Sequence, residues 1–361
     1  YPPQHTGSGL LIDGINKRLM LDQSIEFKFM VYCFTSREIP EEVELTKDIK
    51  FARTDKDFLN FVKLLKEFLF ASFRSDIVQV VTLVQPLILI ASFLSLFMRK
   101  KIILEHTLLE QYLPGRLRKF YKYFTYRFLF KNLKVYSTGL ASQIQEYGFK
   151  GKVYNFGAQV DLSRFSYEPH KILARRKKLG INYKGENCFT FVGAMSHRKG
   201  IDRILELLKD LEGEEDYYLN LVGPSTDYFV EIYQENKDFI ESLVADSKLN
   251  LVIEKSEKVN DYLMSSNFFL FPTRNEGFGA VLIEAMAAGC IPICSKVKWV
   301  TDDFLNKNNS LQFDFSRKRF SESFSQALNM DKMERENLIN QGLKDVTYYS
   351  LERVSNDYKS M

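Results

Sequence analysis

Two carboxylates, Glu276 and Glu284, stand on either side of a turn that is rich in glycine. The pattern predicts a strand that ends just before the turn and a helix that begins at about Gly279. The start of such a helix offers unpaired backbone N–H groups and the positive end of the helix dipole, both of which suit a phosphate. Gly277 and Gly279 allow a ligand to approach the backbone closely. The turn is therefore a candidate anion site.

The two glutamates differ in their expected surroundings. Glu284 lies inside a helix that is otherwise apolar, and a buried lone carboxylate costs several kcal/mol unless a hydrogen bond compensates it. Either an Arg or Lys of the fold pairs with it, or it accepts hydrogen bonds from the hydroxyls of a ligand. Glu276 stands at the mouth of the turn, where it either contacts a ligand or is a solvated carboxylate that favours the helix dipole.

A second candidate site follows another predicted strand. Gly193 ends this strand, and the adjacent cations Arg198 and Lys199 precede a predicted helix. Cations at such an edge could neutralise a diphosphate, although a solvated surface charge pair is the alternative. Gly223 marks a third turn at a strand end, which carries little information by itself.

Strands and helices alternate along the whole chain, which predicts an α/β fold with parallel sheets. In the first half, strands are expected at 26–34, 77–81, 102–104 and 134–137, and helices at 9–21, 57–73, 86–97 and 117–130. In the second half, strands are expected at 189–192, 218–222, 251–253, 268–271 and 291–294, and helices at 201–211, 228–243, 259–264, 280–288 and 332–358. Ligands of such sheets bind at the carboxyl ends of the strands, where both candidate sites lie.

Composition narrows the class of protein further. The chain has 361 residues, of which 45% are hydrophobic and 27% are charged, so it is not a disordered protein. Its net charge of +4 is too small to indicate nucleic acid as a partner. The run from Ile77 to Met98 has no charged residue, and a buried strand and helix explain it better than a membrane span.

The cysteines and histidines show neither a disulfide framework nor the spacing of a metal site. Cys290 and Cys294 are expected to be buried strand residues. The first residues lack the basic region and apolar core of a signal peptide. We therefore expect a cytoplasmic protein.

Taken together, these stretches resemble the retaining glycosyltransferases of family 4. The similarity rests on Gly193 with Arg198-Lys199-Gly200, on Val222-Gly223-Pro224, and on the run from Glu276 through Glu284 to Gly289. It implies the GT-B architecture, in which two Rossmann-like domains face a cleft. Residues 1–165 would form the acceptor-side domain and 166–345 the nucleotide-sugar-binding domain. Residues 346–361 would form a helix that packs back on the first domain.

The resemblance also implies roles for individual residues. Lys199 and Arg198 would bind the donor diphosphate, Glu284 the ribose hydroxyls, and Glu276 the donor sugar near its reacting face. The implied catalytic residues are Glu276, His106 and Lys199. The implied substrate-binding residues are Gly7, Ser8, Gly9, Gly193, Arg198, Lys199, Gly223, Gly277, Phe278, Gly279 and Glu284. The family usually has Arg directly after the glycine at position 193, whereas this chain has Ala194, so the diphosphate contacts would either rely more on Arg198 or be weaker.

By this resemblance, the protein would transfer a sugar from a UDP- or GDP-sugar to a lipid-linked or membrane-proximal glycan. Configuration would be retained, and no metal or other cofactor would be needed. Two alternatives stay open. One is a catalytically silent partner subunit with the same fold, and the other is a nucleotide-sugar epimerase, against which the pair Glu276 and Glu284 argues.

A basic and aromatic segment, residues 116–134, bears on where the protein acts. It carries seven Lys or Arg residues and no acidic residue, with Phe and Tyr residues between the cations. Such a helix can lie on an anionic membrane surface, which would place the protein at the inner face of the membrane. The alternative is a helix that faces the core and has a solvated basic side. No feature indicates nucleic acid as a partner.

Overall fold

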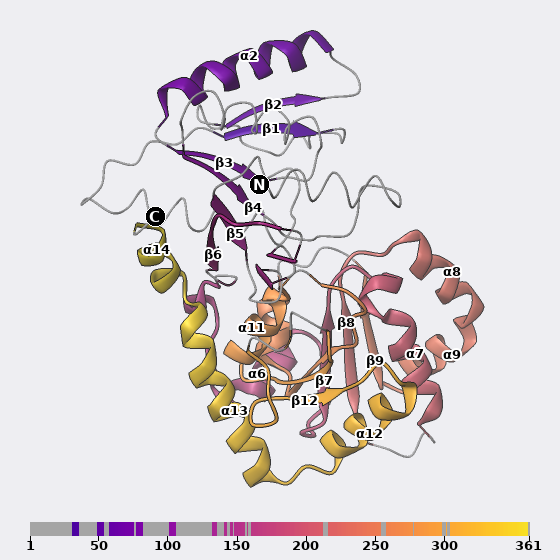
Figure 1. The fold of residues 1–361 in the computed structure, drawn as a ribbon. Coiled ribbons are helices and arrows are strands. Elements are labelled where there is room, and N and C mark those ends of the chain that lie inside the picture. The colour runs from indigo at the N-terminus through magenta and orange to yellow at the C-terminus, as the bar shows by residue number, and fades with distance from the viewer. Residues whose placement is uncertain are drawn as a thin grey trace. The chain divides into compact units, whose positions relative to one another are not determined.

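The computed structural model groups the chain into two α/β units (Figure 1). One unit comprises Tyr1–Gly157 with Leu351–Met361, and the other comprises Ala158–Ser350. The structure describes residues 31–35, 49–53, 58–75, 77–81, 101–105, 132–135, 141–142, 145–146, 148–155, 157, 160–211, 216–253, 258–276, 278–297, 301 and 304–359.

The described part of the first unit contains two parallel sheets. Strands β1 (Val31–Thr35) and β2 (Ile49–Arg53) pair with each other, and helix α2 (Phe58–Arg74) packs against both. The second sheet has the order β3-β4-β5-β6. Its strands are β3 (Ile77–Val81), β4 (Lys101–Glu105), β5 (Asn132–Val135) and β6 (Lys152–Asn155). Helix α14 (Leu351–Lys359) is grouped with this unit.

The second unit is built on one parallel sheet of six strands, in the order β12-β11-β10-β7-β8-β9. The strands are β7 (Cys188–Val192), β8 (Tyr218–Val222), β9 (Leu249–Val252), β10 (Phe268–Phe271), β11 (Ile291–Ser295) and β12 (Leu311–Phe313). The α-helices are α6 (Ile172–Lys178), α7 (Ile201–Asp210), α8 (Asp227–Glu235), α9 (Lys237–Ala245), α10 (Val259–Met264), α11 (Ala280–Ala287), α12 (Arg317–Leu328) and α13 (Lys332–Val346).

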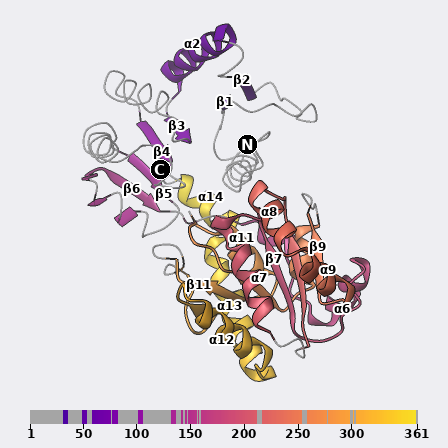
Figure 2. The ribbon, with the colours of Figure 1, turned by 90° about the vertical axis from the view of Figure 1, so that its right-hand side faces the viewer.

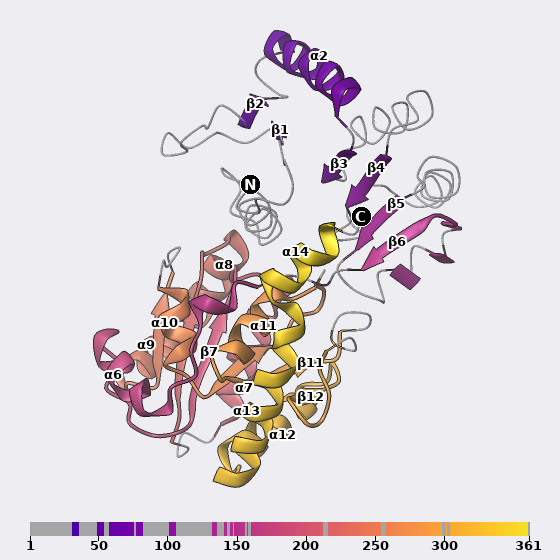
Figure 3. The same ribbon diagram turned by 90° about the vertical axis from the view of Figure 1, so that its left-hand side faces the viewer.

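Both faces of this sheet are covered, as the alternation of side chains along its strands requires. Phe189 and Leu219 belong to a core cluster that includes residues of α7, α9 and α12. Their neighbours Cys188 and Tyr218 point to the other face and pack with Tyr262 of α10. Figures 2 and 3 show the helices on either side of the strands, with α11 and α13 running side by side. The predicted α/β fold is therefore confirmed.

The buried strands lie close to where the sequence predicted them, whereas several short elements were missed. Strands β3, β8 and β10 have the predicted bounds, and the predicted helix 228–243 is divided into α8 and α9 at Asn236. The Asn236 side chain donates to the Ile232 carbonyl at 2.7 Å, which ends α8. Strands β2, β6 and β12 and helices α6 and α12 were not predicted. The predicted helices 9–21, 86–97 and 117–130 lie outside the described residues.

The first and last described segments of the second unit are joined by backbone hydrogen bonding. Val160 donates its backbone N–H to the Tyr349 carbonyl at 2.8 Å, and Val160 also forms a parallel bridge with Ser350. Residues 158–165 and 346–350 group with the second unit, whereas the sequence analysis assigned the former to the first domain and the latter to the C-terminal helix.

Cys290 and Cys294 are buried, as the sequence predicted, and neither forms a disulfide. Burial raises the pKa of Cys290 and raises that of Cys294 to about 12. Both are therefore inert core thiols.

Gly223→Ala should destabilise the second unit strongly, because a Cβ at this position would lie 2.0 Å from the Gly193 carbonyl oxygen. The backbone also has φ +149°, which L-residues rarely adopt. We expect a loss of about 3 kcal/mol from overpacking and strain, measured by thermal unfolding.

Gly180→Ala is the matched control, because Gly180 has φ +74° and nothing within 4 Å of the added Cβ. It should lose only about 1 kcal/mol, the cost of a left-handed conformation. Equal losses for the two variants would show that the contact between Gly223 and Gly193 is not tight.

Candidate functional site

The candidate site lies where the order of the sheet reverses. Strand β7 comes first along the chain, β8 and β9 are added on one side of it, and β10, β11 and β12 are added on the other. The loops that follow β7 and β10 therefore leave the sheet in opposite directions. The carboxyl ends of these two strands are the usual ligand site of an open α/β sheet. Loop 193–200 follows β7, and loop 272–279 follows β10.

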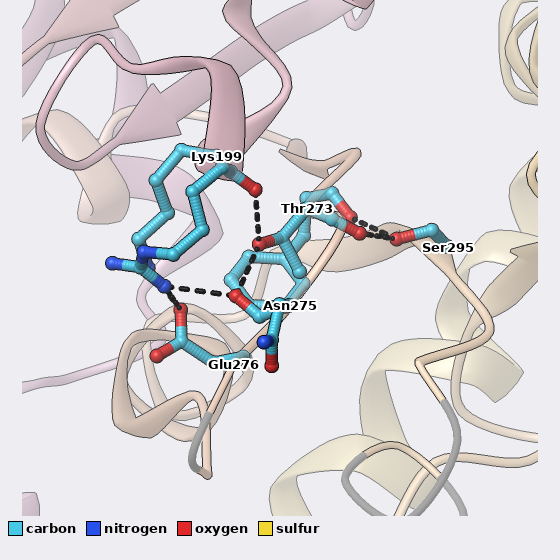
Figure 4. A network of polar contacts seen from close by, with 7 residues as sticks. Lys199, Thr273, Asn275, Glu276 and Ser295 are labelled. Carbon is cyan, nitrogen blue, oxygen red and sulfur yellow. Dashed lines mark hydrogen bonds and ion pairs between the residues drawn. The ribbon is translucent and has the colours of Figure 1, made fainter. Parts of the chain in front are cut away.

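An ion cluster joins these two loops (Figure 4). The Nζ of Lys199 donates to Oε2 of Glu276, and Nη1 of Arg198 lies 3.1 Å from the same oxygen. The side chains of Lys199 and Glu276 are only 12% and 13% exposed, and that of Arg198 is 35% exposed. The cations are therefore not a solvated surface pair, and Glu276 is not a solvated carboxylate.

Buried hydroxyl groups fix the loops that carry the cluster. The Oγ1 of Thr273 donates to the Arg198 carbonyl at 3.0 Å, and the Arg274 backbone N–H donates to the same carbonyl at 2.8 Å. The Oγ of Ser295 donates to the Thr273 carbonyl at 2.5 Å (Figure 4). Both hydroxyl residues are fully buried, so the ends of β7, β10 and β11 hold one another in place.

A second ion pair beside the cluster escaped the sequence analysis. Arg274 donates from Nη1 to Oδ1 of Asp202 at 2.7 Å and from Nη2 to Oδ2, which makes the pair bidentate. Burial raises the pKa of Asp202, but the hydrogen bonds and charge of Arg274 outweigh this effect and hold that pKa below its usual value. Arg274 also donates to the His197 carbonyl at 2.6 Å, so it braces loop 193–200. Asp202 lies two residues after Gly200, and Arg274 lies two residues before Glu276, so both stand next to the motifs that the sequence analysis used.

The glycines at the strand ends form one surface beside Lys199. The backbone N–H of Gly193 donates to the Val222 carbonyl at 3.0 Å, which places Gly223 against Gly193. A Cβ at Gly193 would lie 3.6 Å from Cε of Lys199, so the stem of this lysine runs over the glycine. The predicted residues Gly193, Gly223 and Lys199 thus come together in the structure.

Glu284 lies on α11 and differs electrostatically from Glu276. Among the described residues, no hydrogen bond or ion pair reaches its half-buried carboxylate. Burial raises the pKa of Glu284, and the positive charge of Arg164 lowers it by a smaller amount. Of the two alternatives from the sequence, the pairing with Arg or Lys is therefore not found in the described part of the chain. Arg164, at the start of the second unit, is a neighbour that the sequence analysis missed.

The turn before α11 is anchored by an aromatic side chain. The ring of Phe278 is buried and stacks 5.4 Å from that of Phe304, and Tyr349 lies 5.6 Å away. Phe278 can therefore offer a ligand only its backbone groups. Gly279 is the N-cap of α11. Gly277, His106 and the loop Gly7-Ser8-Gly9 lie outside the described residues, so their roles stay predictions.

The described residues offer neither a metal site nor a membrane-spanning helix. No group of three or more His, Cys, Asp or Glu side chains in them is arranged to hold a metal ion. No helix among them has the length and apolar character needed to cross a bilayer. Most of segment 116–134 lies outside the described residues, and its last residues, 132–134, belong to β5.

The second unit is similar in sequence to known glycosyltransferases. Residues 174–345 match the family model of the glycosyl transferases group 1. A capsular polysaccharide biosynthesis glycosyltransferase, CapH of Staphylococcus aureus, is 36% identical over 121 residues, which cover 32% of this chain and 32% of the relative. The chain spans about a third of the length of the first curated relatives that it matches.

Solved structures extend the likeness to both units. Sucrose-phosphate synthase from Thermosynechococcus elongatus has a TM-score of 0.78 at 16% identity, covering 98% of this chain and 92% of its own. The Anabaena protein Alr3699/HepE, solved in complex with UDP, has a TM-score of 0.72 at 11% identity, covering 86% and 85%. The chain therefore has the GT-B fold, and its residues 174–345 are similar to the glycosyl transferases group 1.

Proposed function

We propose that the protein is a glycosyltransferase that transfers a sugar from a nucleoside diphosphate sugar. The observation that carries this proposal is the cluster of Arg198, Lys199 and Glu276 at the reversal point of the sheet. It lies within the residues that match the glycosyl transferases group 1. Two cations at this edge suit a diphosphate, and an acidic residue beside them suits a sugar hydroxyl.

The cations act on the leaving group. As the bond from the anomeric carbon to the phosphate breaks, negative charge builds on the departing diphosphate. Lys199 and Arg198 stabilise this charge, and the backbone N–H groups at the start of α11 add to the effect. Because Thr273 and Ser295 fix both loops, the donors need little rearrangement during the reaction.

Glu284 binds the ribose of the donor. Its carboxylate has no partner among the described residues and is partly desolvated, so two adjacent hydroxyls would remove an existing cost. Glu276 holds the reacting sugar. To do so, its carboxylate exchanges the cations for sugar hydroxyls while the diphosphate takes its place on Lys199 and Arg198.

The finer features of the reaction belong to the same proposal. The donor is a UDP- or GDP-sugar, the configuration is retained, and no metal ion takes part. The bound UDP of the Anabaena structure and the name of the Staphylococcus aureus relative support a nucleotide donor and a polysaccharide product. The acceptor is a lipid-linked or membrane-proximal glycan, used at the inner face of the cytoplasmic membrane. His106 and the loop Gly7-Ser8-Gly9 contribute from the first unit.

A screen of ligands tests the function as a whole. Nucleoside diphosphates and their sugars that bind the native state raise the melting temperature, and hydrolysis of the bound donor then reports turnover. Binding with slow release of the sugar supports the proposal. Binding without any turnover toward water or a glycan acceptor favours the silent partner subunit instead. The epimerase alternative is not favoured, because the matched family and the named curated relative are glycosyltransferases.

Lys199→Ala should weaken the binding of a nucleoside diphosphate about tenfold to a hundredfold. The reason is the loss of a charge-assisted contact worth about 1.5–3 kcal/mol. The affinity of the nucleoside without phosphates should barely change, and calorimetry measures both. Lys209→Ala, at the far end of α7, is the matched control and should bind like the wild type. An equal loss for both ligands would show that Lys199 supports the fold.

Glu276→Gln should bind the nucleoside diphosphate more tightly while turnover collapses. The amide keeps the size of the side chain but no longer competes with the diphosphate for Lys199 and Arg198. We expect a gain of about threefold to tenfold in affinity and a loss of at least about a hundredfold in turnover. Normal turnover with an identified donor, or unchanged affinity, would contradict the proposed exchange of partners.

Glu284→Gln should stabilise the protein at pH 7 and weaken the binding of nucleosides. The folded-state pKa of Glu284 is raised above the ordinary value of 4.5. The free energy of unfolding therefore falls as the pH rises from the ordinary pKa to the folded-state pKa. The amide cannot ionise, so its melting temperature should exceed that of the wild type at pH 7 but not at pH 4. Affinity for a nucleoside and for its diphosphate should fall by a similar factor, about tenfold.

The exposed glutamate Glu241 provides the control for this prediction. Glu241→Gln should change neither the nucleoside affinity nor the difference in melting temperature between pH 4 and pH 7. If Glu284→Gln lowers the melting temperature at pH 7, the carboxylate has a stabilising partner, and the ribose role loses its basis.

A further inference from the structure

Helix α2 of the first unit has large apolar side chains on its surface. Phe70 and Phe73 are 61% and 59% exposed, and Val62 is 44% exposed. Single exposed apolar residues are common, but three on one helix of 17 residues indicate an interaction surface. Figure 1 shows this helix in indigo beside β1 and β2.

The exposed residues of α2 share one side of the helix. At 3.6 residues per turn, they fall within an arc of about 120° of its circumference. This exposed face of α2 consists of Val62, Lys63, Lys66, Phe70, Phe73 and Arg74. The residues outside the arc include half-buried Leu65, Phe68 and Leu69 and buried Ser72. Among the described side chains of α2, those outside the arc are therefore the more buried ones, and the six within it are exposed.

The charge on this face has one sign. Three of its six side chains are cationic, and none is acidic. Glu67 is the one acidic residue of α2, is half-buried, and lies outside the arc. The guanidinium carbon of Arg74 lies 4.7 Å from the centre of the Phe70 ring, so cationic and aromatic groups alternate closely.

We propose that the exposed face of α2 binds the surface of an anionic membrane. The apolar side chains enter the boundary between headgroups and acyl chains, and the cations contact the lipid phosphates around them. Long Lys and Arg side chains can keep their charged ends in the headgroup layer while their stems cover apolar groups. A protein partner would instead have to bury three cations, which is unfavourable unless each gains a carboxylate. The face is thus better suited to lipid, and this inference does not depend on the proposed activity.

The test measures sedimentation of the full chain with vesicles of phosphatidylcholine that contain or lack phosphatidylglycerol. The wild type should bind the anionic vesicles at low salt, bind the neutral ones weakly, and dissociate as salt is added. In Lys63→Glu/Lys66→Glu, the partition coefficient should fall by at least about thirtyfold, equivalent to about 2 kcal/mol. Phe70→Ser/Phe73→Ser should also lose binding, and its loss should persist at high salt because it removes apolar contact.

Matched variants on the second unit provide the controls. Lys318→Glu/Lys332→Glu reverses two exposed charges, and Met333→Ser removes an exposed apolar side chain. Both should bind vesicles like the wild type, and equal melting temperatures would show that all variants fold. The proposal is overturned if the wild type ignores anionic vesicles, or if the α2 variants bind as well as it does. It is also overturned if light scattering shows a dimer that the α2 variants dissociate without any change in vesicle binding.

Discussion

The pairing of Glu276 with Lys199 and Arg198 ties together the loops that leave the sheet at β7 and β10. These strands are neighbours only because the strand order reverses between them, so the pairing depends on the topology of the sheet. Partly buried charges are unfavourable unless their geometry is held. Thr273 and Ser295 hold it by fixing the loop carbonyls, and Arg274 braces loop 193–200 through the His197 carbonyl.

The fold was predictable wherever burial dictates the sequence. Strands β8 and β10 are buried along their whole length, and apart from the buried Asn220 at the centre of β8 each reads as an apolar run with clear ends. Strand β6 has one buried residue among four, and β12 has only three residues, so neither produces a pattern that separates it from a loop. Helix 228–243 is divided at Asn236, where the backbone has φ −122° and leaves the helical conformation, and the apolar periodicity does not reveal this break.

The site was predictable in its residue types but not in its pairings. Glycines and cations after strands identified Gly193, Arg198, Lys199 and Gly223, because such positions meet at one edge of a parallel sheet. The bond between Arg198 and Glu276 joins residues 78 positions apart, and it follows only from the order of the strands. For the same reason, the pair of Asp202 and Arg274 was overlooked. For Glu284, the sequence offered two alternatives. The described residues contain no Arg or Lys that pairs with its carboxylate, and the contact with ligand hydroxyls stays a prediction.

The charges of the two glutamates of the site are compensated to different extents, and one ligand would provide hydrogen bonds to both carboxylates. Glu276 has its charge compensated by two cations, whereas Glu284 is desolvated with no partner among the described residues. In the proposed complex, a diphosphate on Lys199 and Arg198 would remove the compensation of Glu276 and leave this carboxylate in need of hydrogen-bond donors. Ribose hydroxyls would then supply donors to Glu284, and hydroxyls of the sugar would supply them to Glu276. A free diphosphate would satisfy neither carboxylate, so under this proposal the arrangement would favour the complete nucleotide sugar over its fragments.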